Sequence, residues 1–128
     1  MKRQEFEATL QALAQGWASK DYEKVASHFA EDVQYADPTR YRISSRAELL
    51  EFFRDDEGYD QSTVWHNVVF DEEKQTGAAE YTYQGTHRYH GLVIVKVHGN
   101  LITHWREYQH VSDLGWEDYC DGTLFTAG

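Results

Sequence analysis

A chain of 128 residues with 41% hydrophobic and 15% aromatic residues is suited to one domain with a buried core and excludes a disordered chain. Its formal net charge of −10 argues against a nucleic-acid partner, whose phosphates require a basic face. No apolar run approaches the roughly 20 residues of a membrane span, and no signal-peptide core precedes the first acids. The single cysteine, Cys120, fits a reducing compartment. We therefore expect a soluble, cytoplasmic protein.

Three helices are predicted in the first half of the chain. Residues 3–19 carry apolar side chains at helical spacing, with glutamates and glutamines between them. A second helix is expected over 22–29, with Asp21 as its cap. Ser45 caps a third helix, Arg46–Arg54, with a glutamate at the capping-box position.

The remaining pattern is that of strands. A short strand over 33–37 stops at Pro38, and 39–44 is expected as a loop or irregular extended segment. A later strand leads into an antiparallel meander whose second hairpin turns at His98-Gly99-Asn100. The predicted later strands are 63–71, 78–84, 92–97 and 101–109. The order of elements indicates an α+β domain, with three N-terminal helices packed on a strongly curved sheet.

Two segments are expected to make further contacts. The tail, 111–128, holds too many large apolar groups for a free end: Leu114, Trp116, Tyr119, Leu124 and Phe125. We expect it to fold back on the domain or on a partner subunit. The aliphatic run 92–97 is apolar on both faces, which predicts a homodimer formed through the outer face of the sheet.

Several short motifs, in this order and spacing, resemble the nuclear transport factor 2-like superfamily, specifically its SnoaL-like branch. They are Gly-Trp-Ala-Ser-Lys-Asp at 16–21, His-Phe-Ala-Glu-Asp-Val at 28–33, Tyr-Ala-Asp-Pro at 35–38, Ser-Arg-Ala-Glu-Leu at 45–49, Gly-Thr-His at 85–87 and Gly-Asn-Leu-Ile-Thr-His-Trp-Arg-Glu-Tyr at 99–108. The resemblance implies a cystatin-like cone whose mixed or antiparallel sheet wraps around an internal pocket, in one domain spanning 1–128. Members of this superfamily include isomerases, epoxide hydrolases, polyketide cyclases, dehydratases and proteins that bind without catalysis.

The resemblance also suggests site residues. The closing Trp-Arg-Glu-Tyr is similar to a motif of limonene epoxide hydrolase-like members, whose acid points into the pocket; this implies Glu107, with Trp105 beside it. Tyr35 and Asp37 share a face of the first strand and match pocket positions. Tyr81 and Tyr83 stand where those hydrolases have an arginine and an aspartate, so hydrolysis of epoxides by that route is not expected. The predicted ligand-binding residues are Trp17, Tyr81, Tyr83, His87, Tyr89 and Trp105.

These residue types together are suited to acid/base catalysis. A carboxyl buried among aromatic rings has a raised pKa and becomes a usable acid or base near neutrality. Glu107 or Asp37 would be the base, and phenols such as Tyr35 would donate hydrogen bonds to a developing enolate. No metal is expected, since His87 and His90 are three apart on a strand and point to opposite faces, and no cofactor is required.

Plainer readings remain open for each residue. Glu107 could pair with a cation on a neighbouring strand, Asp37 could cap the turn at Pro38, and the tyrosines could be core. The sequence therefore supports a protein that binds a small, largely apolar molecule, with cofactor-free acid/base catalysis (isomerase, dehydratase or cyclase type) as one hypothesis. A non-catalytic ligand-binding protein, or a dimeric interaction domain whose pocket its own aromatics fill, is the alternative.

Overall fold

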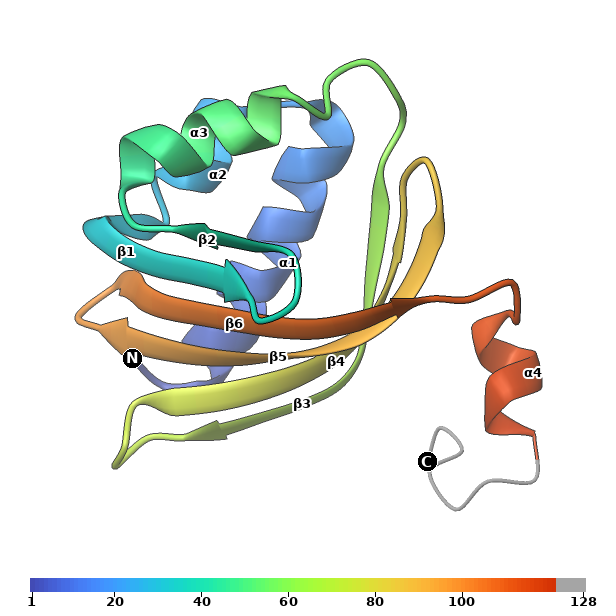
Figure 1. Cartoon of the computed structure of the whole chain (residues 1–128). Helices are drawn as coiled ribbons and strands as arrows, with labels where there is room; N and C mark the ends of the chain where they lie inside the picture. Colours follow the sequence, from blue (N-terminus) through green and yellow to red (C-terminus); the bar gives the residue numbers. More distant parts are fainter. Residues whose placement is uncertain (122–128) are drawn as a thin grey trace.

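The computed structural model describes residues 1–121, in which the first three helices lie on the concave side of one curved sheet (Figure 1). In chain order the elements are α1 (Arg3–Ser19), α2 (Tyr22–Ala26), β1 (Phe29–Asp37), β2 (Tyr41–Ile43), α3 (Arg46–Arg54), β3 (Ser62–Asp71), β4 (Thr76–Gln84), β5 (Arg88–His98), β6 (Leu101–Val111) and α4 (Trp116–Cys120). None of the helices in this range is both long and apolar enough to cross a bilayer.

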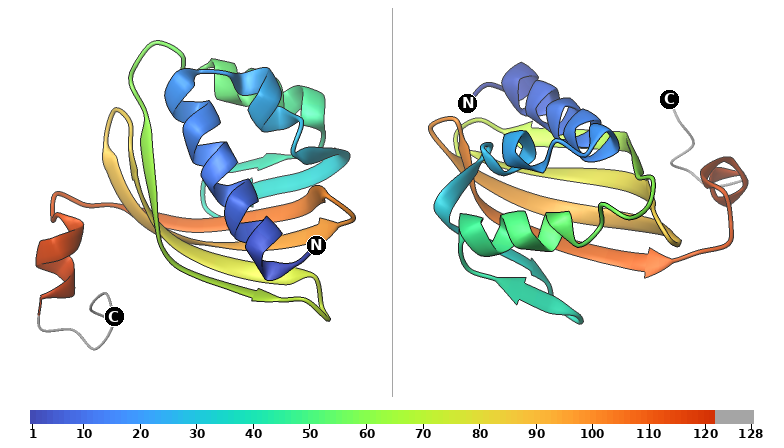
Figure 2. Two further views of the ribbon diagram at one scale, coloured as in Figure 1. Left: turned by 180° about the vertical axis from the view of Figure 1, so that it is seen from behind. Right: turned by 90° about the horizontal axis from the view of Figure 1, so that it is seen from above.

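The six strands form one mixed sheet in the order β2-β1-β6-β5-β4-β3. Strands β3 to β6 are an antiparallel meander, whereas β1 runs parallel to β6 and antiparallel to β2. The sheet bends strongly around α1, which crosses its concave face (Figure 2). The predicted α+β cone is therefore confirmed, including the turn at Gly99, which adopts the positive φ of 61° that glycine accepts at low cost.

Helix α1 forms the inner wall of the cone. Phe6, Leu10, Leu13 and Trp17 follow its helical repeat and are buried against the sheet. Phe6 stacks on Phe70 of β3 with ring centroids 4.6 Å apart. The helix ends at Ser19 because Lys20 takes the left-handed conformation, with φ of 62°.

The structure corrects two expectations about the first strand. The second helix ends at Ala26 rather than at 29, and Phe29 already belongs to β1. Pairing with β6 explains this, since Phe29 lies opposite Ile102 and the Ile102 amide donates to the His28 carbonyl at 2.9 Å. The segment 39–44, expected as a loop or irregular extended segment, contains the regular strand β2, which pairs with β1 through a tight turn after Asp37. This hairpin carries Tyr41 over the concave face.

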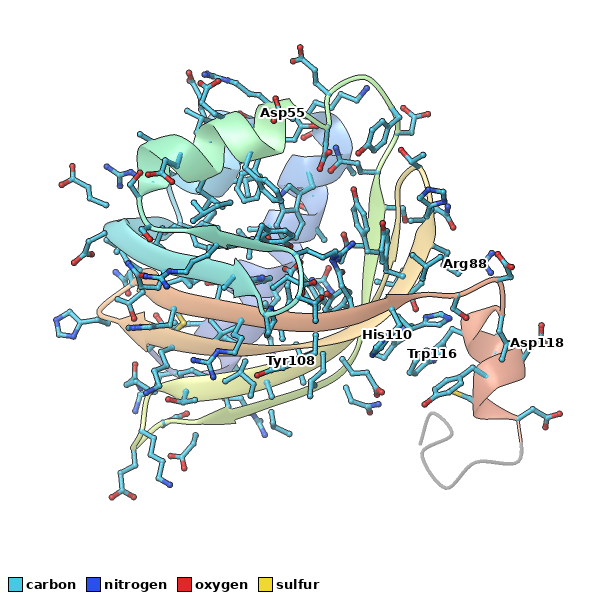
Figure 3. The ribbon with its side chains drawn as sticks, in the orientation of Figure 1. Asp55, Arg88, Tyr108, His110, Trp116 and Asp118 are labelled. Atoms are coloured by element: carbon cyan, nitrogen blue, oxygen red, sulfur yellow. The ribbon has the colours of Figure 1, made fainter. Side chains whose placement is uncertain are left out.

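The described part of the tail packs on the opposite, convex face of the sheet. The Trp116 ring of α4 stacks on the His66 ring of β3 with centroids 3.7 Å apart. His90 Nε2 lies 2.7 Å from the Leu114 carbonyl oxygen, and the Arg88 guanidinium donates to the Asp113 carbonyl at 2.9 Å. Figure 3 shows Arg88, His110 and Trp116 gathered between β6 and α4. Leu124 and Phe125, which the sequence analysis placed in the same apolar tail, lie outside the described residues.

Candidate functional site

A cavity of about 230 Å³ lies between the helices and the concave face of the sheet. It is smaller than the about 300 Å³ at which sites for drug-sized molecules begin, so it suits a small ligand. The residues that line it come from α1, α3, all six strands and the loops between them: Trp17, Tyr35, Arg40, Tyr41, Phe52, Phe53, Asp56, Tyr59, Gln61, Thr63, Trp65, Tyr81, Tyr83, Thr86, His87, Tyr89, Trp105, Glu107 and Gln109.

Glu107 is the buried acid of this cavity, with 6% of its surface exposed. Three donors meet its carboxyl group: the Tyr41 hydroxyl, the Trp105 indole Nε1 at 2.6 Å and the Gln109 amide nitrogen at 3.0 Å. Burial raises the pKa of Glu107, and these hydrogen bonds act in the opposite direction without cancelling the effect. The carboxyl group is therefore closer to the range in which it can exchange a proton at neutral pH.

A hydrogen-bond chain connects Glu107 to β4. The Tyr81 hydroxyl donates to Gln109 Oε1 at 2.7 Å, and Gln109 in turn donates to Glu107. Strand β5 lies between β4 and β6, and its residue at this level of the register is Gly91. A Cβ at Gly91 would lie 2.7 Å from the Tyr81 hydroxyl oxygen and 2.8 Å from Gln109 Cβ. The missing side chain is what lets the two residues join across β5.

We therefore expect Gly91→Ala to disturb the site as well as the sheet. The added methyl group overlaps Tyr81 and Gln109, and overpacking of this kind costs about 1–3 kcal/mol of unfolding free energy. Urea denaturation would measure the loss. Gly58→Ala is the matched control, because a Cβ at Gly58 meets nothing within 4 Å. Equal stabilities for the two variants would contradict the close contact described here.

Tyr35 lies in the cavity wall beside Glu107, and its ring stacks with a neighbouring aromatic ring. Its ring is parallel to that of Trp105, at an interplanar angle of 2° and 5.6 Å between centroids, and its exposed fraction is 4%. Register explains the pair, since Tyr35 of β1 lies opposite Trp105 of β6. Burial, followed by the nearby Glu107 carboxyl, raises the pKa of Tyr35, so the phenol remains a proton donor.

Asp37 is placed differently from Glu107 and is not among the cavity-lining residues. Its carboxylate accepts from the Thr39 amide at 2.9 Å, the Thr39 hydroxyl at 2.8 Å and the Arg40 guanidinium at 3.0 Å. Burial by itself would raise the pKa of Asp37, but together these bonds lower it. The geometry favours the reading in which Asp37 caps the turn, and the role of a base fits it poorly.

Asp37→Asn is expected to lower stability in a pH-dependent way. Hydrogen bonds to a charged group contribute about 1.5–3 kcal/mol each, and the amide keeps only part of this set. Because the pKa of Asp37 is lowered by folding, the stability it contributes is present above its ordinary pKa of about 3.9 and is lost as the pH falls through the lowered value. Urea unfolding at pH 7 and below pH 4 should show the gap between wild type and variant narrowing with acid; a constant gap would contradict this.

The other residues predicted to contact a ligand all line the cavity: Trp17, Tyr81, Tyr83, His87, Tyr89 and Trp105. The Tyr81 hydroxyl is already engaged with Gln109, as the Tyr41 hydroxyl is with Glu107, so either phenol must leave its partner before it donates to a ligand. Tyr41 and Gln109 were missed by sequence reasoning. Strand alternation places Gln109 on the face of Glu107 and could have found it, whereas Tyr41 required the unforeseen strand β2. Within residues 1–121, no group of three histidine, cysteine or acidic side chains is placed to hold a metal ion.

Comparisons with known proteins agree with this architecture. The SnoaL-like domain family matches residues 10–106. An LEH-like epoxide hydrolase of M. tuberculosis has a TM-score of 0.73 at 18% identity, with 84% of both chains covered. A candidate ketosteroid isomerase from Kribbella flavida DSM 17836 has a TM-score of 0.73 at 19% identity, covering 98% of this chain and 93% of that one.

A third similar structure is a protein of unknown function with a cystatin-like fold from Methylobium petroleophilum PM1. Its TM-score is 0.75 at 18% identity, with 98% of this chain and 95% of that one covered. At such identities the structures share a fold with this chain, which does not extend to a reaction. No curated protein matches the sequence. With most of its length matched by the family and the cone and cavity in place, the chain belongs to the SnoaL-like domain family.

Proposed function

We propose that this protein binds a small, largely apolar molecule in the cavity and that Glu107 transfers a proton on it, next to a carbonyl group. The observation that carries the proposal is a buried carboxyl group with a raised pKa among aromatic walls. Solved structures with a similar fold are named as isomerase, epoxide hydrolase and polyketide cyclase, which is compatible with a catalytic role.

The roles follow from the geometry. In its carboxylate form Glu107 removes a proton from the carbon beside the carbonyl, and the negative charge that develops falls on the carbonyl oxygen. Tyr41, whose hydroxyl already donates to the Glu107 carboxyl group, would turn its O–H toward that oxygen. Burial, followed by the charge of Glu107, raises the pKa of Tyr41, so it keeps its proton at neutral pH. An O–H donor held in a water-poor site stabilises an enolate by several kcal/mol, on the order of 3.

The test uses a substrate that reports proton transfer directly. Cyclohex-3-enone becomes cyclohex-2-enone when a proton leaves the carbon between carbonyl and double bond and another is added at the far end of the double bond. The conjugated product absorbs in the ultraviolet, so its formation is followed by absorbance. Rate acceleration by the wild-type chain that is lost in Glu107→Gln supports the proposal. A wild-type rate equal to buffer for this and other small enones would refute it.

One observation favours binding without catalysis as a second candidate. Both oxygens of Glu107 already accept hydrogen bonds, from Trp105 on one and from Tyr41 and Gln109 on the other. Hydrogen bonds to the carboxylate favour it over the protonated acid, which weakens Glu107 as a base but is no disadvantage to a binding protein. Saturable quenching of tryptophan fluorescence by an enone, without any turnover, would support this second candidate.

We further propose that the convex face of the sheet pairs with a second copy of the chain. Five of its large apolar side chains are exposed by 38% to 64%: Val64, Val69, Leu92, Ile94 and Tyr108. Sedimentation equilibrium is expected to give about twice the chain mass of 15.0 kDa, and Leu92→Glu to give the monomer. Gln11→Glu, an added charge on the exposed side of α1, should leave the assembly unchanged. A monomer at all concentrations would contradict the pairing.

A further inference from the structure

The apolar part of the cavity wall has an unusual composition. In the described chain, every apolar side chain that lines the cavity belongs to phenylalanine, tyrosine or tryptophan, and no leucine, isoleucine, valine, methionine or alanine takes part. Aliphatic and aromatic side chains serve equally well to bury a neutral apolar molecule. Only aromatic rings also carry a negative electrostatic face, which attracts cations. The wall is therefore better matched to a positively charged molecule than to a neutral one.

Of the aspartate, glutamate, lysine and arginine side chains that line the cavity, two are acids and one is a cation. Glu107 lies inside and Asp56 lines the mouth, on the acidic loop that follows α3. Figure 3 shows Asp55 at the start of this loop, on the same side of the molecule as α3. The lining cation, Arg40, is bound to the Asp37 carboxylate at 3.0 Å, so its charge is matched within the protein. The carboxyl groups of Glu107 and Asp56 have no such cation in the cavity.

A cation already lies on these rings. The Arg40 guanidinium carbon is 5.1 Å from the ring centroid of Tyr89 and 5.9 Å from that of Tyr41. Both distances are within the about 6 Å over which a cation is attracted to an aromatic face. Two rings of the cavity wall therefore interact with positive charge in the free protein.

From these features we propose that the cavity binds a small organic cation, an ammonium group whose substituents are alkyl groups. The inference rests on the proposed function only in that a small molecule enters the cavity; it concerns the charge of that molecule. A primary ammonium brings three N–H donors that need acceptors. Of the about four acceptor positions of the Glu107 carboxyl group, three are already taken by Tyr41, Trp105 and Gln109, so a single one is left for such donors. An alkylated ammonium needs few acceptors or none, and its alkyl groups are buried against the rings.

A bound cation would also bear on the chemistry of Glu107. Positive charge close to a carboxyl group favours its ionised form. The ligand would thus hold Glu107 as the carboxylate, which is the form that accepts a proton. The formal net charge of −10 on the chain acts in the same direction at longer range, since it attracts cations at low salt.

The test compares two molecules of the same shape. Choline carries a trimethylammonium group, and 3,3-dimethylbutan-1-ol carries a tert-butyl group in its place. Binding is followed by isothermal titration and by fluorescence of Trp17, Trp65 and Trp105, which line the cavity, at matched ionic strength. We expect choline to bind at least about tenfold more tightly, because desolvated cation–π contacts and two carboxyl groups favour it. The preference should fall in Glu107→Gln and in Asp56→Asn.

Glu80→Gln is the matched control for these variants. Glu80 lies on the same sheet but pairs with Asn67 at 2.8 Å, away from the cavity, so its replacement should keep the preference for choline. Equal or tighter binding of the neutral alcohol overturns the inference while leaving the proposed binding of apolar molecules intact. A preference that persists undiminished in Asp56→Asn and Glu107→Gln also overturns it, as does failure of the wild-type chain to bind choline. The enone assay tests the proposed function separately.

Discussion

Glu107→Gln is expected to reduce the rate of cyclohexenone isomerisation at least about 100-fold, because the amide cannot accept the proton that a general base removes. The variant keeps the size of the side chain, so the cavity and its walls remain. The difference in stability between the wild type and this variant should nevertheless change with pH. Folding raises the pKa of Glu107, so the folded state disfavours the carboxylate.

The sign of the pH effect follows from linkage. The wild-type chain loses stability as the pH rises from the ordinary glutamate pKa of about 4.3 to the raised value in the folded state, and Glu107→Gln lacks this loss. The free energy of unfolding of the wild type minus that of the variant should therefore be largest in acid and decrease towards neutrality. Urea titrations at a series of pH values measure it. A difference that does not vary with pH would mean that Glu107 has an ordinary pKa.

Trp105→Ala is expected to destabilise the chain by about 3–5 kcal/mol, as large-to-small changes of a buried tryptophan do. Trp105 is 2% exposed and packs on rings from α1, β1 and β3: Trp17, Phe29, Tyr35 and Trp65. The substitution also removes the indole N–H that donates to Glu107. Both losses fall at the junction between the helices and the sheet.

Trp116→Ala is the matched control for this prediction. Trp116 stacks on His66 at the convex face and is only half-buried, so its removal should cost less than half as much. Trp105→Phe should recover part of the loss by restoring a ring but not the hydrogen bond to Glu107. Urea unfolding of the three variants decides the matter. If Trp105→Ala and Trp116→Ala are equally stable, Trp105 is not the centre of packing.

The elements with local causes were the ones that sequence reasoning predicted well. Helix Arg46–Arg54 has its N-cap at Ser45, whose hydroxyl accepts a hydrogen bond from the Glu48 amide at 3.1 Å. The two residues are close in the sequence, so a local pattern is enough to predict this contact. The start of β1 depends instead on pairing with β6, which is distant in the sequence. Strand β2 depends on pairing with β1 across the turn that follows Asp37. The secondary-structure propensities of a segment of five or six residues do not specify which strand it will pair with.

The residues of the candidate site also fall into two groups: those whose position the sequence pattern predicted and those whose side-chain partners it did not predict. Alternation along the last predicted strand placed Glu107 and Trp105 on one face, and both residues line the cavity. The same alternation put Asp37 beside Tyr35, but its immediate neighbours Thr39 and Arg40 bind its carboxylate and change its chemistry. Side-chain partners within a turn depend on dihedral angles that residue identity alone does not specify.

The place of β6 in the sheet has a consequence for how the protein is made. Although β6 is the last strand in the part of the chain that the structure describes, it lies between β1 and β5 in the middle of the sheet. A ribosome must therefore release almost the whole chain before β1 finds its parallel neighbour and the cavity gains Trp105, Glu107 and Gln109. Until then the nascent chain presents two unpaired strand edges, which are sites of aggregation. Premature termination before Leu101 would leave a fragment that aggregates, with neither cavity nor acid.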